Sequence, residues 1–385
     1  MPAGSCIPPW DIWMLQCWIW QLQSPAQLLA LLQRAAEDDI NLDTQEAFAR
    51  AIQAAIPLPH SKIAVQTSYQ RQVVGAVFKY AEATGLEISE TLADLQVRLL
   101  LAPSASSEPD PGWSLRTYCY GPQDPGVCLR TEPFSSIISN VASLEESPGI
   151  LRPPGQANCN LISLHTANNM LEGSTGCHLW QASFLLAEYV LSHPDDFRGK
   201  ICAELGCGTG LVGICLSHLK ACRQIILTDG NRDSLENCCR NLDQNGVPYI
   251  GPEDGAGMES PQDQEAKQVI LRHQDWADCW HGAVPDVILG ADLLYDPGAT
   301  RLLVILLEGM LRVASGPQPM ALLAATARTP ETFDVFTRAI AASALQFKDI
   351  TRDPSSMSTG LRIKFQHLVL LQPQLPVRLL LVSRR

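Results

Sequence analysis

A glycine-rich segment near the middle of the chain has the residue types and spacing of a ligand-binding loop. Residues 204–211 read Glu-Leu-Gly-Cys-Gly-Thr-Gly-Leu, and they follow a predicted strand and open a predicted helix. Glycines at 206, 208 and 210 let the backbone turn tightly and leave room for a ligand, and the helix start offers unpaired N–H groups. A loop in this position is where a doubly wound sheet binds a nucleotide.

Two cofactors are compatible with this loop. Gly208, Gly210 and Gly213 match the dinucleotide fingerprint, but Glu204 and Gly206 would then lie inside the strand where packing is tightest. The alternative places Glu204 at the strand end and resembles the loop of S-adenosylmethionine (SAM) methyltransferases. SAM carries an ammonium and a sulfonium, which a carboxylate attracts, whereas a carboxylate repels pyrophosphate. The pattern favours SAM over NAD, and a turn that binds nothing is a third possibility.

Acidic residues end the next two predicted strands. Asp229 lies nineteen residues after Gly210, where a carboxylate can accept both ribose hydroxyls of a nucleoside; alternatively, it caps the helix that starts at residue 231. Asp275 and Trp276 follow the third strand. The acid can accept the adenine amino group while the indole packs on the ring, although a loop acid beside a core tryptophan would look the same.

The fourth predicted strand ends with an acid and a phenol that suit amine chemistry. Residues 288–295 read Ile-Leu-Gly-Ala-Asp-Leu-Leu-Tyr, so Asp292 and Tyr295 emerge at the sheet edge beside the glycine loop. A lysine amine must be neutral to act as a nucleophile, yet free lysine has a pKa of ~10.4. An acid and a phenol can bind, orient and desolvate it, and a nearby sulfonium lowers its proton affinity. The other interpretation is that Asp292 caps the helix beginning at residue 297.

Alternating strands and helices must position these residues. The predicted strands span 200–205, 224–228, 269–272, 285–290 and 320–326, and the predicted helices span 178–191, 211–219, 231–244, 297–313 and 331–345. A final extended pair is predicted near 347–351 and 361–371. Such alternation is typical of an α/β, doubly wound and mostly parallel sheet with helices on both faces.

The remaining chain divides into segments without visible chemistry. Residues 1–102 have apolar residues at helical spacing, including a tryptophan-rich start that we expect to dock its aromatic face on the body. Residues 103–140 are predicted as a linker and a β-hairpin with strands at 115–120 and 127–130. Residues 141–172 lack a sustained period and are interpreted as a loop or insert.

Composition excludes several classes of protein. The chain has 385 residues, 46% hydrophobic and 18% charged, so it can bury a large core and is not disordered. Its formal net charge of −12 disfavours nucleic acid and anionic membranes as partners. The sequence shows no secretory signal and no apolar stretch long enough for a membrane span, and its thirteen cysteines follow no framework. We expect a cytoplasmic protein with free thiols and no metal site.

Together, these motifs resemble the seven-stranded SAM-dependent methyltransferases. The Asp-x-x-Tyr of residues 292–295 and a tryptophan at 180 resemble the protein-lysine methyltransferases among them. Ala-Asp-Leu-Leu-Tyr-Asp-Pro at 291–297, Ala-Arg-Thr-Pro-Glu-Thr at 327–332 and the helical N-terminal region are most similar to the elongation factor 2 lysine methyltransferase family. Residues 141–172 interrupt that family's pattern, and the apolar tail 372–385 is unmatched.

The resemblance implies a Rossmann-like, seven-stranded methyltransferase domain over residues 173–371, with SAM as the cofactor. It implies that Asp292 and Tyr295 are catalytic and receive a protein lysine, with elongation factor 2 as the leading substrate and the N-terminal helices as its dock. The cofactor-binding residues implied are Trp180, Glu204, Gly206, Cys207, Gly208, Gly210, Asp229, Asp275, Trp276 and Ala291. The alternatives are another protein substrate, an NAD-dependent oxidoreductase, and a non-catalytic binding module with a methyltransferase fold.

Overall fold

The computed structural model describes twelve parts of the chain: residues 9–21, 25–35, 40–54, 67–102, 112–121, 160–168, 173–252, 269–312, 318–328, 330–351, 365 and 376–385. The chain divides into two compact units. One comprises Met1–Ser163 and Phe365–Leu371, and the other comprises Leu164–Lys364 and Gln372–Arg385. Each unit is considered by itself.

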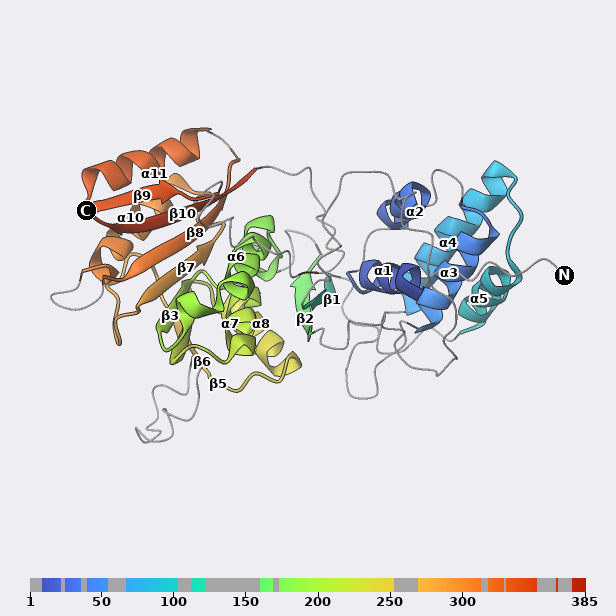
Figure 1. The fold of residues 1–385 in the computed structure, drawn as a ribbon, viewed down its shortest axis with the longest axis horizontal. Helices are drawn as coiled ribbons and strands as arrows, with labels where there is room; N and C mark the ends of the chain where they lie inside the picture. The colour runs from blue at the N-terminus through green and yellow to red at the C-terminus, as the bar shows by residue number, and fades with distance from the viewer. Residues whose placement is uncertain are drawn as a thin grey trace. The chain divides into compact units, whose positions relative to one another are not determined.

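The first unit is a helical body, as predicted for residues 1–102. Its helices are α1 (Pro9–Trp20), α2 (Pro25–Ala35), α3 (Leu42–Ala54), α4 (Thr67–Thr84) and α5 (Glu90–Leu101), drawn in blue to cyan in Figure 1. Trp18 and Trp20 are buried in its core together with Phe48 and Ile52. These two indoles therefore pack inward, because burying an indole removes a large apolar surface from water.

A two-stranded sheet follows the helices. It is formed by β1 (Trp113–Tyr120) and the start of β2 (Asn160–Ala167), where the Thr117 and Ser163 hydroxyl oxygens lie 2.8 Å apart. The prediction of a strand at 115–120 is confirmed, and its predicted partner at 127–130 lies outside the described residues.

The prediction of a loop or insert throughout 141–172 was wrong for β2. Half of the strand's residues are polar, and two of these, Ser163 and Thr166, are buried together with apolar neighbours. Hydrogen bonds satisfy such side chains when they are buried, so alternation of apolar and polar residues could not reveal the strand. Of the rest of 141–172, only residue 168 is described.

The second unit is built on one eight-stranded sheet with the order β5-β6-β4-β3-β7-β8-β10-β9. The strands are β3 (Ile201–Leu205), β4 (Gln224–Asp229), β5 (Tyr249–Ile250), β6 (Val269–His273), β7 (Val287–Ala291), β8 (Met320–Thr326), β9 (Leu345–Asp349) and β10 (Val377–Arg384). The strands from β5 to β8 in this order run parallel, and β10 is antiparallel to both neighbours. The predicted doubly wound, mostly parallel α/β sheet is confirmed, with the two-residue β5 as an additional edge strand.

Helices cover both faces of this sheet. They are α6 (Gln181–Ser192), α7 (Leu211–Leu219), α8 (Arg232–Gln244), α10 (Pro297–Met310) and α11 (Pro330–Ala342). Ile201, Ala203 and Leu205 of β3 share a core with α10 and α11. Successive side chains of a strand point to opposite faces, so Cys202 and Glu204 face the other layer, where α6 and α7 pack together (Figure 1).

The C-terminal segment corrects a predicted boundary. The sheet domain was predicted to end at residue 371, with 372–385 as a tail, but β10 pairs with both β8 and β9. The strand predicted at 347–351 is confirmed as β9, which pairs with β10. Of the strand predicted at 361–371, all but Phe365 lies outside the described residues. A run of four apolar residues at 379–382 suits a strand covered on both faces.

None of the helices in the described parts of the chain is both long and apolar enough to cross a membrane.

If β10 is part of the folded sheet, the residue that it buries in the core, Leu380, should contribute to the free energy of unfolding. Leu380 is fully buried in the core shared with α10 and α11, whereas its neighbour Leu381 is half-buried. Leu380→Ala should lower the free energy of unfolding by about 2–5 kcal/mol, and Leu381→Ala should lower it by clearly less. Urea denaturation of the full chain measures both. Equal, small losses would show that the segment is a tail.

Candidate active site

The glycine loop after β3 has a backbone that only glycine adopts easily. Gly206, Gly208 and Gly210 have φ values of +61°, +52° and +81°. A Cβ at Gly208 would lie 2.8 Å from the Gly176 carbonyl oxygen, and one at Gly210 would lie 2.7 Å from the Cys238 sulfur. The predicted tight turn is therefore present, and both its conformation and its surroundings exclude side chains.

Backbone hydrogen bonds tie the loop to the end of β4. The Cys207 N–H donates to the Thr228 carbonyl at 2.8 Å. The Asp229 carboxylate accepts the Gly208 N–H at 3.0 Å and the Asn231 N–H at 2.9 Å. The cap of α8 is Asn231, which accepts the Ser234 N–H at 3.1 Å. Asp229 is thus a bridge between loop and helix and does not cap α8.

A half-buried acid, Asp229, and a buried acid, Glu204, stand beside the loop. Burial raises the pKa of Asp229, partly offset by the N–H groups that it accepts. Burial also raises the pKa of Glu204 well above its usual range, and the negative charge of Asp229 adds to this shift. The Glu204 Oε2 is buried without a hydrogen-bond partner among the described residues. A buried carboxylate oxygen of this kind is costly unless a ligand satisfies it.

Asn241 supports the loop from behind and was not predicted. It is fully buried on α8, and its amide donates to the Thr209 carbonyl at 2.9 Å and to the His165 carbonyl at 3.2 Å. Its Oδ1 accepts the His165 N–H at 2.6 Å. One amide therefore joins the glycine loop, α8 and the end of β2.

The residues after β6 form another side of the site. The Asp275 carboxylate is exposed and accepts the Ala277 N–H at 2.9 Å. The half-buried Trp276 ring lies 3.7 Å from the position of a Cβ on Gly206. Both residues lie next to the glycine loop, as predicted. Gln274, which was not predicted, is buried in the same wall.

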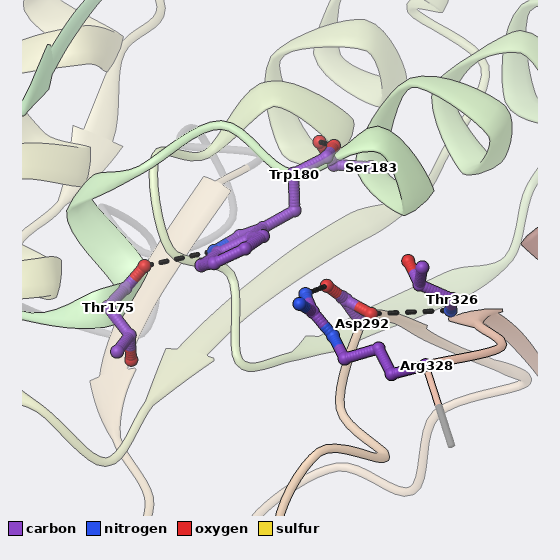
Figure 2. Close-up of polar contacts among 6 residues, drawn as sticks. All are labelled: Thr175, Trp180, Ser183, Asp292, Thr326 and Arg328. Atoms are coloured by element: carbon purple, nitrogen blue, oxygen red, sulfur yellow. Dashed lines mark hydrogen bonds and ion pairs between the residues drawn. The ribbon is translucent and has the colours of Figure 1, made fainter. Parts of the chain in front are cut away.

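Asp292 is held in place after β7 by three contacts. Its backbone is left-handed, with φ +57°, and its N–H donates to the Ala324 carbonyl at 2.7 Å. Its buried carboxylate accepts the Thr326 N–H at 3.3 Å and pairs with the Arg328 guanidinium at 2.5 Å (Figure 2). The interpretation of Asp292 as a helix cap was wrong, because Asp296 caps α10.

Trp180 and Arg328 lie opposite each other in the site. The predicted helix at 178–191 begins at residue 181, so Trp180 is its N-cap residue, and the indole N–H donates to the Thr175 carbonyl at 3.0 Å. The guanidinium of Arg328 lies 4.7 Å from the centre of the indole ring; Figure 2 shows it between Trp180 and Asp292. Arg328 was not predicted as a site residue, although it follows β8 just as the predicted site residues follow their strands.

Tyr295 lies at the edge of the site and is 52% exposed. Burial raises the pKa of its phenol, the charges of Asp229, Asp296 and Asp292 raise it further, and a hydrogen bond with Thr175 acts in the opposite direction. The phenol is therefore neutral at physiological pH and can donate or accept a hydrogen bond.

A single cavity of about 580 Å³ joins these parts, a volume in the usual range for a small-molecule site. It is lined by eleven of the twelve predicted site residues: Trp180, Glu204, Gly206, Cys207, Gly208, Asp229, Asp275, Trp276, Ala291, Asp292 and Tyr295. Gly210 does not line it and instead turns the chain into α7. The described residues contain no group of three side chains that could hold a metal ion.

Comparisons with known proteins agree with this geometry. A family model described as "Lysine methyltransferase" matches residues 160–341. The bovine Protein-lysine N-methyltransferase EEF2KMT is 31% identical over 242 residues, which cover 58% of this chain and 69% of that protein. The Chaetomium thermophilum Protein-lysine N-methyltransferase EFM3 is 27% identical over 168 residues, covering 43% and 47%.

An uncharacterised protein of Dictyostelium discoideum is 30% identical over 191 residues, and the match spans about half of each chain, 46% of this one and 52% of that one. The family model, the bovine relative and the glycine-loop cavity all indicate the same class of protein. The chain therefore belongs to the family of SAM-dependent lysine methyltransferases.

Proposed function

We propose that the chain transfers a methyl group from SAM to the side-chain amine of a lysine in another protein. The observation that best supports this is the continuity of one cavity, which reaches from the glycine loop with Glu204 and Asp229 to Asp292 and Tyr295. A methyl donor and an acceptor amine have to meet within bonding reach, and this cavity has residues suited to each.

The residues around the loop suit SAM as the bound cofactor. The unsatisfied Glu204 Oε2 can accept the ammonium of the methionine part, and the Gly206 and Gly208 backbone leaves room for it. Asp229 keeps lone pairs for the ribose hydroxyls beyond the two N–H groups that it accepts. Trp180, Trp276 and Asp275 are available to the adenosine part. When bound, SAM supplies a methyl group activated by its sulfonium.

Asp292 and Tyr295 act on the lysine in this proposal. The Asp292 carboxylate attracts the protonated side chain into the cavity and orients its nitrogen, and the Tyr295 hydroxyl supplies a second hydrogen bond at the rim. The lysine gives its proton to water before transfer, because its lone pair has to be free to attack. Positioning accounts for most of the acceleration.

Elongation factor 2 is the substrate that we propose. The name of the bovine relative contains the abbreviation of this factor, and residues 291–297 and 327–332 resemble the same family. The helical first unit would dock the substrate, because one lysine side chain carries too little identity to select a protein. Such a substrate implies a cytoplasmic enzyme.

Cofactor binding should depend on the empty space at Gly208. Gly208→Ala should weaken SAM binding by more than about tenfold, because the new Cβ meets the Gly176 carbonyl and strains a backbone at φ +52°. Gly199→Ala is the matched control, since Gly199 has φ +70° but open space around it. Calorimetric titration with SAM measures both. Equal affinities for the two variants would contradict the placement of the cofactor.

SAM affinity should fall as the pH is lowered. The raised pKa of Glu204 means that it is protonated at a higher pH than an ordinary glutamate, and the neutral acid cannot pair with an ammonium. Binding of the cation should therefore release protons from the protein. Titrations at a series of pH values upward from the ordinary glutamate pKa of about 4.3, in buffers of different ionisation enthalpy, detect this release. Glu204→Gln should lose most of the pH dependence; a variant that kept all of it would exclude this role.

Asp292 should matter for transfer more than for cofactor binding. Asp292→Asn should keep SAM binding within about threefold but reduce transfer of tritiated methyl to elongation factor 2 by at least about 100-fold. Asp278→Asn removes an exposed acid on the same side of the sheet and should change neither. Full transfer by Asp292→Asn would exclude the proposed role. SAM binding by the wild type without transfer to any protein would favour the non-catalytic module.

A further inference from the structure

Arg328 already provides a cation at the place proposed for the substrate lysine. Its guanidinium pairs with the Asp292 carboxylate at 2.5 Å and lies 4.7 Å from the centre of the Trp180 ring (Figure 2). All three side chains line the cavity. A carboxylate beside an aromatic face is the arrangement that also binds an ammonium group.

The two partners of Arg328 are fixed, whereas Arg328 has room to move. Asp292 is held by the Ala324 carbonyl and the Thr326 N–H, and Trp180 is held by its hydrogen bond to Thr175. The Asp292 side chain is only 6% exposed, but that of Arg328 is 33% exposed and emerges just after the end of β8. Movement of Arg328 toward water would open the subsite without disturbing its walls.

We propose that Arg328 occupies the lysine subsite of the free protein and has to be displaced before a substrate lysine can pair with Asp292. This inference rests on the proposed function. Leaving the buried Asp292 carboxylate unpaired is costly, so the free protein keeps the subsite closed with its own cation. An incoming lysine then exchanges one ion pair for another.

This exchange makes Arg328 a residue that determines specificity. The apparent affinity for a lysine is the affinity of the open subsite multiplied by the fraction of protein in which the subsite is open. A free amine or an unrelated lysine gains little by displacing Arg328. A lysine on a protein that also binds elsewhere on the enzyme brings additional binding energy, so it can displace the guanidinium. The same carboxylate thus rejects small amines and accepts a presented lysine.

A second role for Arg328 would have different consequences. If Arg328 stayed on Asp292 throughout the reaction, it would orient the carboxylate as a positioning residue. Its removal would then lower the turnover of every substrate and would not strengthen the binding of a small amine. Binding of a small lysine analogue separates the two roles without requiring turnover.

The test uses the full chain saturated with S-adenosylhomocysteine and Nα-acetyl-lysine methylamide as the probe. Arg328→Met removes the charge but keeps an extended side chain, and it should bind the probe about tenfold more tightly than the wild type by calorimetry. Arg338→Met, which removes an exposed arginine of α11, should bind it as the wild type does. Unchanged binding of S-adenosylhomocysteine shows that each variant is folded.

Equal or weaker probe binding by folded Arg328→Met would overturn the proposal. A second measurement needs no folded variant: the Nε–H NMR signal of Arg328 in the wild type should move to the position of exposed arginines as the probe saturates the site. A signal that stays unchanged while the Trp180 indole signal shifts would also overturn it. Failure of the wild type to methylate elongation factor 2 would instead count against the proposed function. The probe-binding measurements do not depend on methyl transfer, so failure of the Arg328 proposal can be told apart from failure of the proposed function.

Discussion

The position of the active site depends on the Asp229 carboxylate and the two backbone N–H groups that it accepts. One comes from Gly208 in the loop after β3, and the other comes from Asn231 at the start of α8. A single side chain therefore joins the loop, the end of β4 and the helix that follows. Because β3 and β4 are parallel neighbours, their carboxyl ends meet at one edge, where the loop can face a ligand.

The charges of the cavity explain why it suits cations. Among the described residues that line it, four are carboxylates, Glu204, Asp229, Asp275 and Asp292, and Arg328 is the only lysine or arginine. This distribution disfavours a pyrophosphate, and thus NAD, but suits both the ammonium of SAM and a substrate lysine. Arg328 balances Asp292, the acid that the substrate would need. The cavity, like the chain as a whole, therefore has more acidic than basic residues, and there the acids can bind cations.

Most of the site could be predicted because its polar residues follow the buried strands directly in the sequence. The strands β3, β4, β6 and β7 each contain a short apolar run, and the residues at or after their ends fall at one edge of a parallel sheet. Glu204, Asp229, Asp275 and Asp292 were found in this way. Trp180 came from resemblance, because a tryptophan before a helix has no distinctive spacing of its own.

What could not be predicted depends on contacts between distant parts of the chain. The strand β2 mixes polar and apolar residues on both faces and is stabilised by partners such as Asn241, which donates to the His165 carbonyl from 76 residues away. β10 is separated by more than fifty residues from its neighbour β8, so no local pattern indicated that it belongs in the sheet. Arg328 was visible as a residue after a strand, but only the structure shows its contacts with Asp292 and Trp180.

The central claim is that this cavity joins a methyl donor to a protein lysine. Mass spectrometry of purified elongation factor 2, digested after incubation with the full chain and SAM, tests it most directly. The account predicts added methyl groups on a lysine of the factor that are absent when SAM is omitted. Methyl groups found only on other residue types, or their absence from the factor although calorimetry shows that SAM is bound, would contradict it.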